Sequence, residues 1–202
     1  NQCSMVMGQE KGSYYYILKD IYTLAPESSK ELAKKFIDFF KFHKNKVLYM
    51  YYDRSGNQYK AVKRDWATEI KDHIERYEGV PTGWKVKLMS EDQGTIYQEQ
   101  EFKFAKSLLG EHYPKLPKLK IDKHQCRHLK SSMELTKTKT SKKNGSTVIE
   151  KDKSSEKNLA LKKLPMHSTN FSDAFKYLIY RRKWVRIASR KVASAQIDPE
   201  TY

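Results

Sequence analysis

Residues 47–53, with the sequence VLYMYYD, are the stretch that decides the fold. Six consecutive apolar or aromatic residues end in an acid, Asp53, and the loop-forming sequence RSGN follows at residues 54–57. A short, continuous apolar run predicts a strand covered on both faces, which is typical of the centre of a mixed or parallel sheet. Asp53 is then expected at the carboxyl end of that strand.

The segments on either side alternate between strand and helix patterns. Two runs rich in β-formers, residues 3–9 and 13–24, predict a pair of strands joined by a turn around Gly12. The other predicted elements are a helix capped by Ser28 and Glu31, a helix over 62–77, a strand over 84–89, and helices over 95–109 and 172–187. This order predicts an α/β fold, with helices flanking a mixed sheet.

Positive charge is concentrated in one part of the chain. The whole sequence has 40 Lys and Arg against 24 Asp and Glu, a net charge of +16, and residues 115–163 hold 15 against 5. An excess of 15 − 5 = 10 in one segment indicates a polyanionic partner, either nucleic acid or an anionic membrane. Because residues 136–157 are polar and have few apolar anchors, they predict a mobile basic loop or β-hairpin.

Other features narrow the class of protein. The longest apolar run, residues 47–52, is far shorter than the roughly 20 residues that span a bilayer, so we expect no membrane partner. The two cysteines cannot form a disulfide framework, which fits a reducing cytoplasm. The start at Asn1, without a secretory leader, leads us to expect a piece of a longer protein. We expect one domain over 1–190 and a C-terminal tail over 191–202.

Asp53 and Asp173 are the two candidate catalytic residues. Asp53 stands where open α/β sheets place their ligands, although a strand-end Asp also caps turns. Asp173 lies in the first turn of the last predicted helix, where the helix dipole alone favours an acid. If the fold brings both carboxylates together, they would form the kind of oxygen-rich site that Mg²⁺ or Mn²⁺ needs.

Other residues that could carry chemistry fit structural roles better. His124, Cys126 and His128 have alternate spacing and no second Cys/His pair, so we interpret them as surface or core residues rather than a zinc site. The tyrosines at 14–16 could stack on bases, but aromatic residues in strands more often form core and cross-strand pairs. The sequence has no Gly-rich phosphate-binding loop of the P-loop type.

Four segments together resemble the C-terminal nuclease domain of the large terminase subunit of tailed bacteriophages. They are MVMGQ at residues 5–9, YYYILK at 14–19, VLYMYYD at 47–53 and NFSDAF at 170–175. The resemblance covers residues 3–185 and implies a ribonuclease H-like fold. It also implies a location in the host-cell cytoplasm during phage assembly.

The resemblance further implies an endonuclease that uses two Mg²⁺ or Mn²⁺ ions to cut concatemeric viral DNA with little sequence preference. The strand-end acid of the family corresponds to Asp53, and the acid that opens its last helix corresponds to Asp173. The family has another acid within its first strand; here no acid precedes Glu10, so that acid lies upstream of Asn1 or is absent. The implied partners are an ATPase domain in the full-length chain, a small terminase subunit and a portal.

The basic segment supplies the expected DNA contacts. Lys137, Lys139, Lys142 and Lys143 are the residues that we expect to hold duplex DNA by its phosphates, without reading bases. Three alternatives stay open. The chain could be a non-catalytic basic nucleic-acid-binding module in which both acids are structural, another ribonuclease H-like enzyme such as a resolvase, or a structural protein of the virion.

Overall fold

The computed structural model describes residues 2–53, 65–89, 92–93, 98–143 and 146–194; the predicted loop at 54–57 lies outside them. Its strands are β1 (Gln2–Lys11), β2 (Tyr14–Leu24), β3 (Val47–Met50), β4 (Arg76–Tyr77), β5 (Val80–Pro81), β6 (Lys85–Leu88), β7 (Lys118–Ile121), β8 (Lys137–Lys143) and β9 (Ser146–Asp152). Its helices are α1 (Ser29–Phe39), α2 (Trp66–Glu75), α3 (Gln98–Leu109), α4 (Arg127–Leu135), α5 (Leu164–His167), α6 (Asn170–Ile179) and α7 (Arg182–Ser194), with short 3-10 helices η3 (Ser154–Glu156) and η4 (Leu161–Lys163). The chain is therefore a mixed α/β protein, as predicted.

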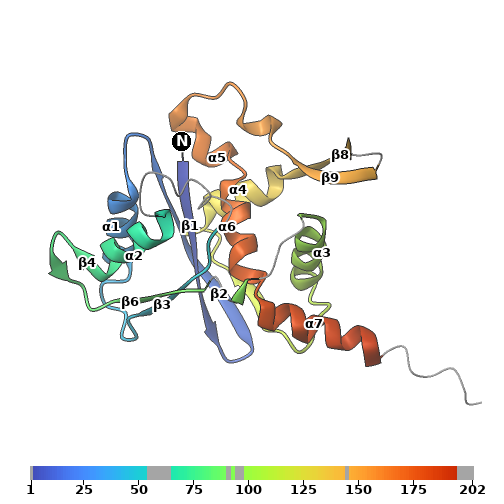
Figure 1. Cartoon of the computed structure of the whole chain (residues 1–202), viewed down its shortest axis with the longest axis horizontal. Coiled ribbons are helices and arrows are strands. Elements are labelled where there is room, and N and C mark those ends of the chain that lie inside the picture. Colours follow the sequence, from blue (N-terminus) through green and yellow to red (C-terminus); the bar gives the residue numbers. More distant parts are fainter. Residues whose placement is uncertain (1, 54–64, 90–91, 94–97, 144–145, 195–202) are drawn as a thin grey trace, which may run out of the picture.

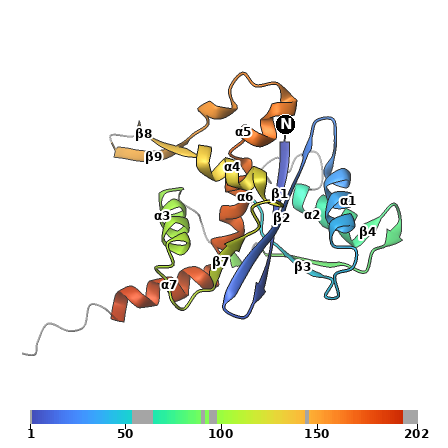
Figure 2. The ribbon, with the colours of Figure 1, turned by 180° about the vertical axis from the view of Figure 1, so that it is seen from behind.

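A long antiparallel hairpin of β1 and β2 forms the centre of the molecule (Figure 1). Its turn contains Gly12, whose φ of 60° lies in the left-handed region that glycine adopts at little cost. β7 adds to the other edge of β2 in parallel, so these strands form a mixed three-stranded sheet (Figure 2). β7 and α4 come from residues 115–135, for which the sequence pattern predicted no element.

β3 and β6 pair in parallel as a separate two-stranded ladder. The prediction that the 47–53 strand is covered on both faces is wrong, because Tyr49 is 52% exposed. Tyrosine carries a hydroxyl that water can solvate, so a tyrosine-rich run does not have to be buried on both sides. The strand nevertheless contributes Met50 to the core, and Asp53 follows its carboxyl end after Tyr51 and Tyr52.

The β1–β2 hairpin separates two hydrophobic cores. Side chains alternate along a strand, so the neighbours Val6 and Met7 belong to different cores. The face with Val6 packs on α3, α4, α6 and α7, and the opposite face packs on α1, α2, β3 and β6, as the two sides of the hairpin in Figures 1 and 2 show. This layering places α6 directly against β1.

A β-bulge lets β2 serve both cores. Ile17 and Ile21 are an even number of residues apart, which would put them on one face of a regular strand, but they lie in different cores. The register shifts next to Met7, which pairs with Lys19, while the following residue of β1 pairs with Ile17, so Leu18 has no partner in β1. The extra residue reverses the alternation of side chains along β2.

Two predicted helices differ in what determines where they end: contacts between neighbouring residues in one case, and tertiary contacts in the other. Helix α1 begins as predicted: Ser28 and Glu31 form a reciprocal capping box at its N-terminus. The predicted helix over 172–187 is wrong in its continuity, because the chain breaks at Tyr180 and divides into α6 and α7. The side chain of Arg181 bonds the Leu178 carbonyl at 2.7 Å, which satisfies a C-terminal carbonyl that a continuing helix would have used.

The basic segment 136–157 is a β-hairpin, one of the two forms that its composition predicts. β8 and β9 pair in antiparallel register from Lys137 opposite Asp152 to Lys143 opposite Ser146. The hairpin reaches out at the edge of the molecule beside α3 (Figures 1 and 2). At the C-terminal end, α7 continues to Ser194, so the first four residues of the predicted tail are helical. Within the described residues no helix is both long and apolar enough to cross a membrane.

Candidate active site

Asp53 lies three residues beyond the end of β3, and its side chain is exposed. It lines a cleft of about 990 Å³ that is bounded by β1, β3 and α6. The hydroxyl of Tyr177, from α6, donates a hydrogen bond to the Asp53 carboxylate. The interpretation of Asp53 as a carboxylate at the carboxyl end of a strand therefore agrees with its place in the structure, and the acid faces a cleft large enough for a ligand.

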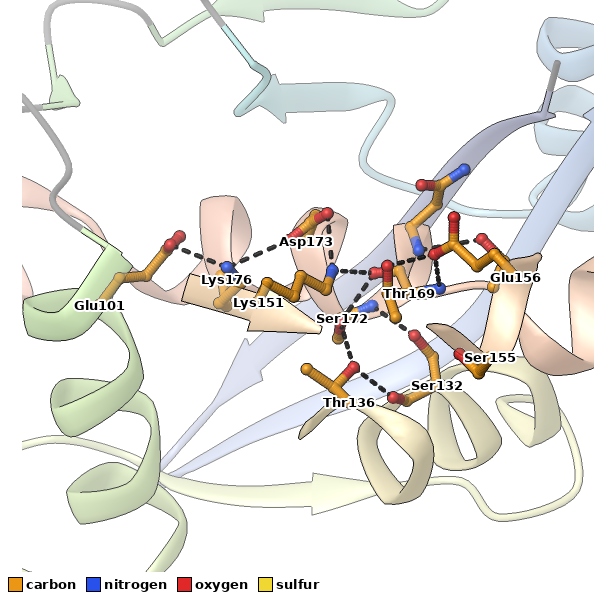
Figure 3. A network of polar contacts seen from close by, with 12 residues as sticks. Glu101, Ser132, Thr136, Lys151, Ser155, Glu156, Thr169, Ser172, Asp173 and Lys176 are labelled. Carbon is orange, nitrogen blue, oxygen red and sulfur yellow. Dashed lines mark hydrogen bonds and ion pairs between the residues drawn. The ribbon is translucent and has the colours of Figure 1, made fainter. Parts of the chain in front are cut away.

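Asp173 lies in the first turn of α6 and lines the same cleft. Its two carboxylate oxygens are both in ion pairs, one with Lys151 at 2.7 Å and one with Lys176 at 3.0 Å (Figure 3). The structural alternative for Asp173 was a cap or a first-turn carboxylate, and Asp173 does lie in the first turn of α6, where the helix dipole favours an acid. The Glu156 carboxylate accepts a hydrogen bond from the backbone N–H of Thr169 at 2.6 Å, just before the helix.

Tyr177 connects the two candidate acids. It follows Asp173 by four residues, so both side chains lie on one face of α6. Burial raises the pKa of the Tyr177 hydroxyl, and the negative charges of Asp53 and Asp173 raise it further. The pKa of one hydroxyl group is thus affected by two carboxylates that are 120 residues apart in the sequence. The structure places Asp53 and Asp173 along the same cleft, which the sequence patterns left as a hypothesis.

A buried ion pair between Lys176 and Glu101 holds one of the two lysines that contact Asp173. Lys176 contacts Glu101 of α3 at 2.9 Å as well as Asp173, and the Glu101 side chain is only 5% exposed (Figure 3). Burial disfavours the charged form of Lys176, but Glu101 and Asp173 together outweigh this effect and hold the pKa of Lys176 above its usual value. Breaking such a pair would leave an uncompensated charge in the interior, so Lys176 is firmly held.

Lys151 is the cation on the other side of Asp173. It comes from β9, and only 8% of its side chain is exposed. Its ammonium group also donates a hydrogen bond to the Thr169 carbonyl at 2.6 Å. Burial holds the pKa of Lys151 below its usual value, and Asp173 opposes that effect only in part. Lys151 is therefore less strongly stabilised as a cation than Lys176.

The fit of these residues to a divalent metal ion is mixed. Asp53 fits, since Mg²⁺ and Mn²⁺ prefer exposed carboxylate oxygens in a cleft. Asp173 does not fit in the arrangement described, because two ammonium groups already hold its oxygens. Within the described residues, no group of three or more His, Cys, Asp or Glu side chains could hold a metal ion. These residues therefore do not form a complete metal site with the hairpin in this position.

The predicted DNA-contacting lysines lie on β8, at the edge of the molecule. Lys137, Lys139 and Lys142 are exposed, and the side chain of Lys143 is outside the described residues. None of the three exposed lysines lines the cleft that contains Asp53 and Asp173. The same hairpin does enter the acidic site, but through Lys151 of the opposite strand. The hairpin thus combines an exposed basic edge with one inward lysine.

Sequence reasoning missed Lys151, Lys176, Tyr177 and Glu101. For two of them a helical signal existed, because Lys176 and Tyr177 follow Asp173 by three and four residues, the spacing that places side chains on one face. No local signal marks Lys151 or Glu101. Their positions depend on how β9 and α3 pack against α6, which neither segment determines alone.

Of the three residues His124, Cys126 and His128, the last two are engaged in contacts within the core. His128 is bonded to Asp20 of β2, with its Nδ1 2.8 Å from the carboxylate, and its ring stacks on Phe171. Cys126 is buried in the core, and burial raises the pKa of its thiol to about 12. A zinc ligand must be a thiolate, so this environment opposes metal binding. Their interpretation as surface and core residues agrees with these contacts.

The tyrosines at 14–16 divide between the two faces of the sheet. Tyr15 is in the core, edge-on to Trp184, while Tyr16 is 36% exposed. Arg181 lies over the Tyr15 ring at 4.7 Å from its centroid and holds it in place. The structural interpretation of this run is confirmed for Tyr15, the residue that packs in the core.

Comparison of the chain with family models, with curated proteins and with solved structures gave no match.

Proposed function

We propose that the chain is a divalent-metal-dependent endonuclease domain of a viral DNA-packaging terminase, with Asp53 and Asp173 as its metal-binding carboxylates. The carrying observation is that both acids line one cleft and both act on the hydroxyl of Tyr177. We also propose that the fold is ribonuclease H-like. In support, an antiparallel strand pair is followed by α1, β3, α2 and β6, of which β3 and β6 are parallel.

The charge distribution supports duplex DNA as the substrate. Exposed lysines on β8 lie on the same hairpin as Lys151, which pairs with Asp173, so DNA held by its phosphates would be kept near that acid. Contacts with phosphates carry no base information, which suits cutting with little sequence preference. The partners proposed with this function are an ATPase domain, a small terminase subunit and a portal, and its location is the host-cell cytoplasm.

The proposed metal ions are Mg²⁺ or Mn²⁺, and their role would be to supply positive charge and an activated water at the phosphate. Tyr177 would then position Asp53 through its hydrogen bond. Lys176, held by Glu101, would keep Asp173 oriented on α6. These are the contributions of the chain itself, and each can be removed separately.

The experiment is cleavage of supercoiled plasmid DNA with Mn²⁺ by the unmodified chain, Asp53→Asn and Asp173→Asn. Since loss of groups that merely support metal ligands costs about 10–100-fold, loss of either acid should reduce the rate by at least about 100-fold. Duplex affinity should change little, because it depends mainly on lysines. Asp38→Asn is the control, since Asp38 is an exposed acid on α1 that pairs with Lys34.

A second candidate function is a non-catalytic basic nucleic-acid-binding module. The observation that favours it is the double ion pair of Asp173, in which the acid has a structural role. Full activity of both Asn variants, or no Mn²⁺-dependent cleavage by the unmodified chain, would support this module and reject the nuclease.

A further inference from the structure

We infer that Lys151 occupies the position of a cation at Asp173, so that the docked β8–β9 hairpin and a divalent metal ion compete for this carboxylate. The inference deepens the proposed function, on which it rests, because it assigns a regulatory element to the same site. It makes the hairpin an internal inhibitor that must leave Asp173 before a metal ion can bind there.

The geometry at Asp173 supports competition. Lys151 lies 2.7 Å from one carboxylate oxygen, and Lys176 lies 3.0 Å from the other. A magnesium ion binds oxygen at about 2.0–2.1 Å, so a metal ion on the carboxylate oxygen that Lys151 holds would lie within a few ångströms of the Lys151 ammonium group. Two like charges at such a distance repel strongly in a partly buried site. The carboxylate therefore cannot serve both partners at full strength.

Lys151, rather than Lys176, is the lysine that can leave. Lys176 is on the same helix as Asp173, and its departure would strand the buried carboxylate of Glu101. Lys151 belongs to a hairpin, and none of the hairpin side chains described is buried in either core. Moving the hairpin would break polar contacts, whereas moving α6 would take Phe171 and Phe175 out of the core, so displacement of the hairpin costs less.

The base of the hairpin provides a pivot. After β9, Glu156 accepts a hydrogen bond from the Thr169 backbone at 2.6 Å, and Ser155 donates one to the His167 carbonyl at 3.0 Å (Figure 3). Neither contact includes Lys151 or Asp173. These bonds can hold the segment in place while Lys151 moves away, so the displacement is confined to β8 and β9.

The exposed lysines of β8, the outer strand of the hairpin, would couple the movement of the hairpin to DNA binding. Lys137, Lys139 and Lys142 are exposed on β8, whereas Lys151 is on the partner strand. A duplex held by the outer lysines can pull the hairpin away from the cleft and thereby free Asp173. DNA binding and metal binding would then favour each other, and such coupling must be reciprocal.

The test is the affinity for Mn²⁺ without DNA, measured by electron paramagnetic resonance of the free ion for the unmodified chain and Lys151→Met. We expect Lys151→Met to bind Mn²⁺ about 10-fold more tightly, within the 5–150-fold range of typical coupling. Lys153→Met is the control: Lys153 lines the cleft that contains Asp173 and carries the same charge as Lys151, but no contact joins it to Asp173 in the part of the chain described. It should change the affinity by less than about 3-fold.

Equal effects of Lys151→Met and Lys153→Met would overturn the inference, because they would show only a general effect of charge. The inference would also be overturned if Lys151→Met still bound Mn²⁺ more tightly when it was combined with Asp173→Asn. The same holds if none of the variants bound Mn²⁺. Lys151→Arg keeps the cation and should bind Mn²⁺ as weakly as the unmodified chain. Since only binding is measured, failure of cleavage would reject the nuclease without affecting this result.

Hydrogen exchange of the unmodified chain provides a second measurement that does not depend on the folding of a variant. Mn²⁺ should accelerate exchange in β8 and β9 by several-fold and leave exchange in β1 and β2 unchanged. Identical exchange in the hairpin with and without saturating Mn²⁺ would overturn the inference.

Discussion

The chain contains two long β-hairpins that are held by opposite kinds of interaction. The β1–β2 hairpin is buried on both faces, with Val6 and Ile17 in one core and Met7 and Ile21 in the other. The β8–β9 hairpin has no described side chain in a core, and polar groups hold its base, above all Lys151 on Asp173. Apolar burial makes the first hairpin a scaffold, whereas polar contacts with Asp173 and Thr169 hold Lys151 of the second hairpin.

The largest effect that we predict concerns the scaffold. Ile17 is 1% exposed, so Ile17→Ala leaves a cavity in the core and should lower the free energy of unfolding by about 2–5 kcal/mol. The matched change in the other hairpin, Thr140→Ala, alters an exposed side chain and should cost less than about 0.5 kcal/mol. Urea unfolding measures both. Similar losses for the two variants would contradict the division into scaffold and movable hairpin.

A smaller loss is expected for Gly8→Ala, which tests how closely the scaffold is packed. A Cβ atom at Gly8 would lie 2.4 Å from the Tyr15 ring, and Tyr15 cannot retreat easily because Arg181 covers it. We expect a loss of about 1–3 kcal/mol, as is usual for overpacking, from the same unfolding measurement. Ser13→Ala, at the exposed turn of this hairpin, is the control and should be close to neutral. An unchanged stability of Gly8→Ala would mean that the Tyr15 ring moves.

The smallest effect on stability is expected for the basic edge. Replacing Lys137, Lys139, Lys142 and Lys143 by Gln should change the free energy of unfolding by less than about 0.5 kcal/mol, because surface substitutions rarely do more. The same variant should bind duplex DNA more weakly. If all four residues contact phosphates, the slope of log affinity against log salt should become shallower by up to about 3.6.

Fluorescence anisotropy at several salt concentrations measures that slope. The control has the same charge loss on exposed lysines of the α1 and β6 side: Lys41, Lys44, Lys85 and Lys87, all replaced by Gln. An equal change of slope in the two variants would show that net charge, and not the hairpin, determines DNA binding.

Local patterns predicted much of the scaffold. The strands around Gly12 and the capping box of Ser28 and Glu31 were predictable because neighbouring residues make these contacts themselves. The division of 172–187 into two helices was not, because Arg181 is held by rings of distant segments, including Tyr15 and Tyr51. Tertiary contacts of this kind override the helical pattern.

The sequence by itself determined the mixed α/β class, the positions of two acids at element ends and the concentration of lysines near residue 140. Only the tertiary structure decided which charges meet. It placed Asp53 and Asp173 in one cleft and put Lys151, from the β8–β9 hairpin, on Asp173. The physical reason is the separation in sequence between the interacting residues. Caps and strand patterns arise from residues close in sequence, whereas an ion pair between β9 and α6 exists only when separate segments pack together.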